Sequence, residues 1–339
     1  MKIFSIILIS LFFKSCNETL DYKAVKYKSA VDYFNNQQFD STISILISAS
    51  NNYLLSDSAL SYLALSYFEI KKTDSAIFYL KQAVHQNDKF EIAFYNLGLI
   101  YDYQGNKSEA LQYYDKAILL EPNSKSALYN KALILYNRSE YGEALVLCQR
   151  AIVVDSNYIL PLYLSAQIFK DQHKLDSSLL YNRLLVQKSP NNPEYLFYLA
   201  ISESDNGRND EAIKLYSKSI NISPDNNQSY FNRATLYQSN EQYNLAKIDY
   251  LKTISSKPTE LESYVRLSWI YSKQNQLDST RIILEKALTI DSTYSDAFLY
   301  LGDYFSQKNK MLKACEMYTK ARNLNNSKVI KRIEKCCNI

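Results

Sequence analysis

The stretch from Glu91 to Ser124 reads as two short amphipathic helices joined by a turn, and the rest of the chain repeats its pattern. The apolar residues of its first half share one helical face: Phe94, Leu97, Gly98 and Tyr101. Residues 104–106 contain a glycine and break that helix. The second half again shows one apolar face: Ala110, Leu111, Tyr114, Ala117, Ile118 and Leu120. It stops at Pro122, because proline lacks the amide hydrogen that a helix needs.

The same pattern recurs every 34 residues from position 23 to position 328. Stepping by 34 from Glu91 gives nine repeats without an insertion, which start at Lys23, Asp57, Glu91, Lys125, Ile159, Pro193, Asn227, Leu261 and Ser295. Position 8 is always small: Ala30, Ala64, Gly98, Ala132, Ala166, Ala200, Ala234, Ser268 and Gly302. A small side chain there lets the two helices approach closely. Leu185 is the one bulky residue in the small columns at positions 8, 20 and 27, and it predicts slightly wider helix spacing in the fifth repeat.

This pattern resembles the tetratricopeptide repeat. The family signature places large, small and aromatic residues and a closing proline at set positions, which Phe94, Leu97, Gly98, Tyr101, Ala110, Tyr114, Ala117 and Pro122 occupy here. The resemblance implies an all-α fold, a right-handed superhelical solenoid of tandem helix-turn-helix repeats. Residues 23–328 are expected to form the nine repeats, and residues 329–339 a C-terminal capping helix.

Composition agrees with a helical array and excludes several classes of protein. Only 5 Gly and 6 Pro in 339 residues argue against an all-β fold, which needs many tight turns. A hydrophobic content of 47% excludes general disorder. The formal net charge of +4 provides no strong positive field, so no nucleic-acid partner is expected.

Residues 1–15 read as an export signal, since their apolar run from Ile3 to Phe13 is shorter than the roughly 20 residues of a membrane-spanning helix. The end of this segment resembles the bacterial lipoprotein box, in which Cys16 would receive a diacylglycerol, although Lys14 departs from the usual pattern. The resemblance implies a lipid-anchored protein of the bacterial cell envelope, with residues 16–22 as tether. It favours the outer membrane, on the periplasmic side or at the surface. The alternative is a plain secretory signal followed by an incidental cysteine.

Four further cysteines have different expected roles. Cys148 occupies position 24 of the fourth repeat, which predicts a buried thiol. If the terminal helix stacks as a tenth first helix, Cys336 faces Cys315, and a disulfide is permitted in an oxidising compartment when the Cα atoms come within roughly 7 Å. The alternative is three unpaired thiols at Cys315, Cys336 and Cys337.

The sequence contains no constellation that suggests catalysis or metal binding. His85 and His173 lie in different repeats, with no partner at metal-ligand spacing. The five glycines lie either at position 8 or at the turns between helices, so none is left for a phosphate-binding loop. The sequence therefore predicts no enzymatic activity, no cofactor and no metal site.

In the family that the repeats resemble, the first helices line a concave face, and positions 2, 5, 6, 9, 12 and 13 are candidates for contacting a ligand. The candidate partner-binding residues at positions 5 and 6 are Tyr95, Asn96, Tyr129, Asn130, Tyr163, Phe197, Phe231 and Asn232. Aromatic rings bury a large area at small entropic cost, and an amide both donates and accepts hydrogen bonds, which suits peptide recognition. The alternative is that the aromatic residues pack between neighbouring repeats. The family's basic clamp for chaperone C-termini is absent, because position 5 carries no lysine.

The favoured function is a non-enzymatic protein-protein interaction scaffold, anchored to a membrane of the bacterial envelope, that binds a protein or peptide in its concave groove. Envelope assembly, secretion or cell-wall maintenance are the settings that the resemblance suggests. A second reading is a peptidoglycan or carbohydrate binding module, which stacked aromatic rings would also serve. A third is an enzyme, which would require active residues that the sequence does not show. The oligomeric state stays open.

Overall fold

The computed structural model describes residues 22–51 and 54–337, and this part of the chain contains helices and no strand. The predicted signal and Cys16 lie outside the described residues. The chain divides into two compact units, the first ending at Pro161 and the second beginning at Leu162. The predicted all-helical array of helix pairs is confirmed.

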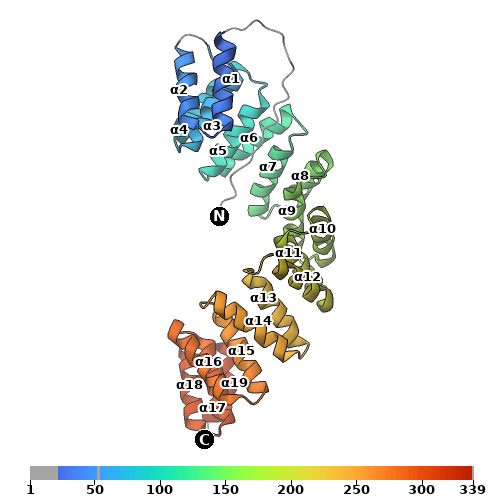
Figure 1. Cartoon of the computed structure of the whole chain (residues 1–339), viewed down its shortest axis with the longest axis vertical. Helices are drawn as coiled ribbons and strands as arrows, with labels where there is room; N and C mark the ends of the chain where they lie inside the picture. Colours follow the sequence, from blue (N-terminus) through green and yellow to red (C-terminus); the bar gives the residue numbers. More distant parts are fainter. Residues whose placement is uncertain (1–21, 52–53, 338–339) are drawn as a thin grey trace. The chain divides into compact units, whose positions relative to one another are not determined.

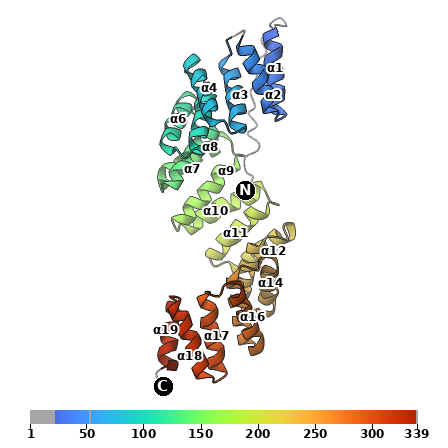
Figure 2. The ribbon, with the colours of Figure 1, turned by 90° about the vertical axis from the view of Figure 1, so that its left-hand side faces the viewer.

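The first unit stacks four helix pairs side by side, as Figures 1 and 2 show. The pairs are α1 (Tyr22–Asn35) with α2 (Phe39–Ser50), α3 (Asp57–Glu69) with α4 (Thr73–Gln86), α5 (Glu91–Tyr103) with α6 (Lys107–Leu120), and α7 (Lys125–Asn137) with α8 (Tyr141–Val154). Each first helix packs against its own second helix, and α2, α4 and α6 also contact the first helix of the next pair. The core is therefore continuous along the stack and includes Leu63, Leu80 and Leu97, all fully buried.

The second unit continues the same order of elements. α9 (Ile159–Asp171) crosses the division between the units and is followed by α10 (Leu175–Lys188). The next pairs are α11 (Pro193–Asp205) with α12 (Asn209–Ile222), α13 (Asn227–Ser239) with α14 (Tyr243–Ser256), α15 (Leu261–Lys273) with α16 (Leu277–Ile290), and α17 (Ser295–Gln307) with α18 (Met311–Asn323). A 3-10 turn, η1 (Ser327–Val329), and α19 (Ile330–Cys337) follow α18.

The turn inside each pair contains one residue with left-handed backbone, and these residues lie 34 positions apart: Gln37, Lys71, Gly105, Ser139, His173, Gly207, Glu241, Asn275 and Asn309. Seven of them are not glycine and have φ between 56° and 66°. That conformation costs a non-glycine residue roughly 1–2 kcal/mol. The cost is offset because the turn closes the helix end with two backbone bonds, as when the Lys71 amide donates to the Phe68 carbonyl at 2.9 Å and the Lys72 amide to the Tyr67 carbonyl at 2.8 Å.

At position 8 of two repeats, the first helix leaves no room for a side chain larger than glycine. A Cβ atom added to Gly98 would lie 2.6 Å from the ring of Tyr114, and one added to Gly302 would lie 2.3 Å from the ring of Tyr318. Both tyrosine side chains are buried. The two glycines of this column therefore occur where a tyrosine ring lies directly against the first helix.

Position 20, on the second helix, carries a hydroxyl in three repeats, and each hydroxyl is buried. The Thr42 hydroxyl donates to the carbonyl of Ala30 at 3.3 Å, and the Ser178 hydroxyl donates to that of Ala166 at 3.1 Å. Thr280 makes the same bond to the position-8 carbonyl of its own repeat at 3.4 Å. Because a buried hydroxyl is tolerated only when it is hydrogen-bonded, these contacts explain why the column accepts serine and threonine in place of alanine.

The C-terminal segment packs on the last helix pair. α19 lies against α18, and Val329 before it is fully buried. The guanidinium of Arg332 binds both carboxylate oxygens of Asp303 on α17, at 2.7 and 3.0 Å. Cys315 is disulfide-bonded, so the prediction that left it as an unpaired thiol is wrong for this residue. Its partner lies outside the residues whose side chains are described.

Two expectations on single core residues have different outcomes. Cys148 is fully buried, as its place in the repeat predicts. Leu185 is also fully buried, while the wider helix spacing expected around it stays a prediction.

The close approach at position 8 predicts the effect of Gly98→Ala. We expect it to lower the free energy of unfolding by about 1–3 kcal/mol, because the new methyl group overlaps the Tyr114 ring. Chemical denaturation would measure the loss. Gly98→Ala/Tyr114→Leu should recover most of it, since the second repeat pairs Ala64 with Leu80 at these positions.

Gly142→Ala is the matched control for that substitution. Nothing lies within 4 Å of a Cβ atom at Gly142, so the variant should be as stable as the parent chain or slightly more stable. Equal stability of the Gly98→Ala and Gly142→Ala chains would contradict the role assigned to the close approach.

Candidate binding surface

Four of the candidate residues lie on α5 and α7 in the first unit and are linked to one another. Asn130 on α7 donates a hydrogen bond from Nδ2 to the hydroxyl of Tyr95 on α5, at 3.2 Å. Tyr95 is only 8% exposed and Asn96 only 2%, whereas Tyr129 and Asn130 are half-buried. We call these four residues and the helix faces that carry them the α5–α7 surface. Tyr129 and Asn130 are its accessible members.

Two further tyrosines support this surface from behind and beside it. The ring of Tyr95 packs on that of fully buried Tyr114, with centroids 6.1 Å apart. Tyr129 meets Tyr158 edge to face at 5.8 Å, and the ammonium of Lys125 lies 5.4 Å from the centre of the Tyr158 ring. The accessible ring of Tyr129 is therefore held by aromatic contacts.

The other four candidates lie in the second unit. Tyr163 on α9 donates from its hydroxyl to that of Tyr198 on α11 at 3.1 Å, and Tyr198 donates to the carboxylate of Glu194 at 3.2 Å. Phe197 is buried at 8% exposure, and its ring packs on Tyr216 at 5.9 Å. Phe231 and Asn232 are half-buried on α13, as is Tyr163 on α9.

One arrangement recurs in both units. The aromatic ring at position 5 lies on the tyrosine at position 24 of the same repeat: Tyr95 on Tyr114, Phe197 on Tyr216, and Phe231 on Tyr250 at 5.8 Å. The asparagine at position 6 of the next repeat lies near the position-24 tyrosine and lowers the pKa that burial raises, in the pairs Asn130 with Tyr114 and Asn232 with Tyr216, although the buried Tyr114 hydroxyl has no hydrogen-bond partner among the described residues. Sequence reasoning missed this role of the position-24 tyrosines. The constant separations of 19 and 16 residues were the available signal.

The burial of these residues divides the candidates into two groups. Tyr95, Asn96 and Phe197 are buried and offer little area to a partner in this conformation. The half-buried group can both support the surface and contact a partner: Tyr129, Asn130, Tyr163, Phe231 and Asn232.

Asn96 differs from the other asparagines because part of its amide is unsatisfied. Its Nδ2 atom is buried and has no hydrogen-bond partner among the described residues. A buried donor without an acceptor costs about 1–3 kcal/mol. The α5–α7 surface therefore contains a buried amide donor whose hydrogen bond is unmade, and the buried Tyr114 hydroxyl behind it likewise has no partner among the described residues.

Other chemistry is not assembled in the described part of the chain. No group of three or more histidine, cysteine or acidic side chains that could hold a metal ion occurs among the residues that the structure describes. None of the described helices has both the length and the apolar content to cross a membrane.

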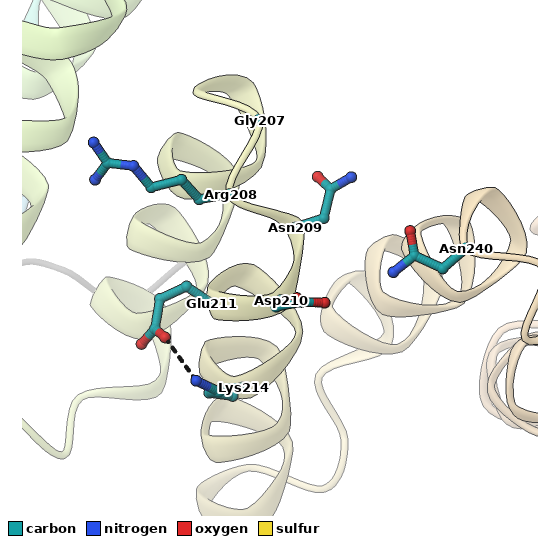
Figure 3. Close-up of a pocket in the computed structure, with 7 residues that line it drawn as sticks. All are labelled: Gly207, Arg208, Asn209, Asp210, Glu211, Lys214 and Asn240. Carbon is teal, nitrogen blue, oxygen red and sulfur yellow. Dashed lines mark hydrogen bonds and ion pairs between the residues drawn. The ribbon is translucent and has the colours of Figure 1, made fainter.

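A pocket of about 510 Å³ lies at the turn between α11 and α12, and none of the candidate residues lines it (Figure 3). It is lined by Gly207, Arg208, Asn209, Asp210, Glu211, Lys214 and Asn240. Lys214 pairs with Glu211 at 3.1 Å, and Arg208 pairs with buried Glu203 at 3.2 Å. Its two cationic side chains thus already have carboxylate partners, and we assign no ligand to this pocket.

Comparison with known proteins agrees with the repeat pattern. Models of the tetratricopeptide repeat match residues 58–89, 92–124, 228–260 and 261–294, and a further model described as a TPR repeat matches residues 203–240. No curated protein matches the chain.

Two solved structures show a similar fold. A tetratricopeptide repeat protein from Parabacteroides merdae ATCC 43184 is 17% identical, with 73% of this chain and 98% of that chain covered and a TM-score of 0.53. Pseudomonas aeruginosa pilF is 16% identical, with 64% and 98% covered and a TM-score of 0.52. At these identities the likeness concerns the fold alone.

Burial of the tyrosines predicts how stability depends on pH. Burial raises the pKa of Tyr95 and of Tyr250 to about 12, from an ordinary value of 10.0. Below pH 10 these tyrosines are protonated whether the chain is folded or unfolded. Between pH 10 and 12 only the unfolded chain releases the protons, so stability falls as pH rises, by roughly 2–3 kcal/mol for each residue.

Absorbance of the tyrosinate anion and circular dichroism, followed through the same pH titration, would measure this effect. We expect a late group of tyrosines that ionise together with the loss of helix. Ionisation of all 31 tyrosines near pH 10 with helicity intact would contradict the burial described above.

Proposed function

Because the chain is a tetratricopeptide repeat protein, we propose that it is a non-enzymatic scaffold that binds a protein or peptide through the first helices of its repeats. The observation that carries the proposal is the set of half-buried aromatic and amide side chains on these helices. Tyr129 and Asn130 in the first unit, and Tyr163, Phe231 and Asn232 in the second, combine apolar area with hydrogen-bonding groups. Rigid aromatic rings beside amides suit the recognition of a polypeptide.

Two features support a peptide as ligand over a small molecule. The described candidates lie along successive first helices, and the pocket found in the described part of the chain is lined by other residues. Neighbouring side chains also hold the accessible ones in place, since Asn130 is fixed by its bond to Tyr95 and the ring of Tyr129 by its contact with Tyr158. A pre-ordered surface loses less entropy when it binds an extended ligand.

Loss of the accessible rings tests the scaffold function. Tyr129→Ala/Tyr163→Ala should reduce the partner recovered by crosslinking and pull-down from native membranes by about tenfold, because two aromatic anchors are lost. Phe78→Ala is the matched control, since it removes an aromatic ring that is 55% exposed on the second helix α4. Circular dichroism should show the same helicity in all three chains. Equal recovery by the double variant and the control would place the binding surface elsewhere.

We further propose that the scaffold is lipid-anchored in a bacterial envelope through Cys16, where it would serve envelope assembly, secretion or cell-wall maintenance. The proposal is supported by the sequence of residues 1–16. Two acyl chains hold a protein stably at a membrane, whereas one holds it marginally. With residues 16–22 as the tether, the first repeat would lie close to the bilayer.

Cys16→Ser tests the anchor in the native host. The substituted protein should move from the membrane fraction to the soluble fraction on centrifugation, because the thiol that would carry the lipid is absent. Cys148→Ser is the control and should stay with the membranes. Sedimentation of the Cys16→Ser protein with membranes would exclude lipidation as the anchor.

A further inference from the structure

Both lysines of the α5–α7 surface have an acidic partner in the structure. α5 and α7 together carry four ionisable acidic and basic side chains. The hydroxyl of Ser124 donates to Glu91 at 2.7 Å, and Asp102 pairs with Lys107. Lys125 pairs with Asp155, and Lys131 pairs with Asp115. Three of the four charges are thus paired with an opposite charge, and the Glu91 carboxylate accepts a bond from a neutral hydroxyl.

Apart from these four ionisable groups, the accessible side chains of this surface are apolar or neutral. Leu99 on α5 and Leu133 on α7 are half-buried at position 9, beside half-buried Tyr129 and Asn130. α5 and α7 belong to neighbouring pairs of the stack (Figure 1). The bond from Asn130 to Tyr95 joins them. The polar groups of this face are therefore an amide and phenol hydroxyls.

A second observation points to a ligand at this face. Asn96 is only 2% exposed, and its Nδ2 atom has no acceptor among the described residues. Because the atom is buried, a ligand reaches it only when the neighbouring side chains move; a main-chain carbonyl would then satisfy the donor without bringing in a charge. A ligand carboxylate would bring in a charge that no cation of α5 or α7 is free to balance.

On the basis of the proposed function, we propose that the α5–α7 surface selects an extended peptide segment without charged side chains. Burial of a charged group against an uncharged surface costs several kcal/mol unless a counter-charge accompanies it. Neutral and apolar segments bury area here without that cost. Selection thus acts mainly by rejecting acidic and basic segments.

The first test measures the preference with random peptides, so the natural partner need not be identified. A library of peptides of about nine residues, which span roughly 30 Å when extended, is panned against the full chain and against Tyr129→Ala/Asn130→Ala. Peptides that prefer the parent chain should contain about threefold fewer Asp, Glu, Lys and Arg residues than the library does. Equal or greater charge in the selected peptides would overturn the inference and leave the scaffold function standing. Enrichment of no peptide at all would contradict peptide binding itself, and the inference with it.

A charge introduced on the surface provides the second test, with one neutral selected peptide as the probe. Leu133→Glu should weaken its binding by about tenfold or more, because the new carboxylate must be desolvated when the peptide binds. Val146→Glu introduces the same charge on the second helix α8, at a side chain that is 59% exposed, and should change the Kd by less than about twofold. If Leu133→Glu does not fold, Asn130→Asp tests the same point with an isosteric change. A folded variant that binds as tightly as the parent chain would overturn the inference.

Salt dependence provides an independent readout with the same peptide. The Kd should change by less than about twofold between roughly 50 and 500 mM salt, because no ion pair forms across the interface. Weakening by about tenfold over this range would show that charge pairing drives binding and would overturn the inference.

Discussion

The close contact between the two helices of each repeat, at position 8, is the constraint on which the rest of the described structure depends. A small residue there lets a large side chain of the second helix lie directly on the first helix, as Tyr114 lies against Gly98. Where position 20 carries a hydroxyl, it donates to the carbonyl of position 8 and holds the pair at the same place. Each helix pair then contacts chiefly the pairs before and after it in sequence, so stability is distributed along the stack.

The same contact connects the core to the candidate binding surface. Tyr114 packs beneath Tyr95, and the amide of Asn130 in the next repeat donates to the Tyr95 hydroxyl. The position-5 aromatic residues are therefore neither purely core nor purely surface. Their rings complete the packing of one repeat, and at Tyr95 the amide of Asn130 in the next repeat also binds the hydroxyl. A binding surface built in this way is pre-ordered by the packing that folds the chain.

The helical pairs could be predicted from the sequence because their signals are local. Apolar spacing, helix-breaking residues and small columns all act within one 34-residue repeat. The accessibility of the candidate residues could not be predicted in the same way. Tyr95 and Asn130 are 35 positions apart, and their bond depends on how two repeats stack. At position 6, Asn96 is buried and Asn130 is half-buried; at position 5, Phe197 is buried and Phe231 is half-buried. These differences depend on such contacts between repeats.

The turns show a different limit of sequence reasoning. Glycine indicates a left-handed residue at Gly105 and Gly207, but the same conformation recurs at Lys71 and Glu241, where the residue type gives no hint of it. The period indicates it instead, since all of these residues occupy position 15. At that position the paired backbone bonds at the helix end outweigh the preference of the individual side chain.

Arg233 on α13 shows how one repeat replaces an apolar contact by a polar one. It occupies position 7, where Leu97 and Leu267 are fully buried in other repeats. Its guanidinium binds both carboxylate oxygens of Asp249 on α14, at 2.7 and 2.9 Å, and the hydroxyl of Ser217 on α12, at 2.8 Å. Asp249 is only 3% exposed, so loss of one partner would leave a buried charge uncompensated.

The Arg233 guanidinium thus joins three consecutive helices through hydrogen bonds of fixed direction. Hydrophobic contacts alone do not fix direction in this way. A shift of α14 along α13 would break two charge-assisted bonds at once, whereas a leucine at position 7 would slide with little change in contact. The buried pair therefore adds little to overall stability, because the desolvation of both charges opposes their attraction. Its physical effect is directional, and it constrains how the α12, α13 and α14 helices lie against one another within the second unit.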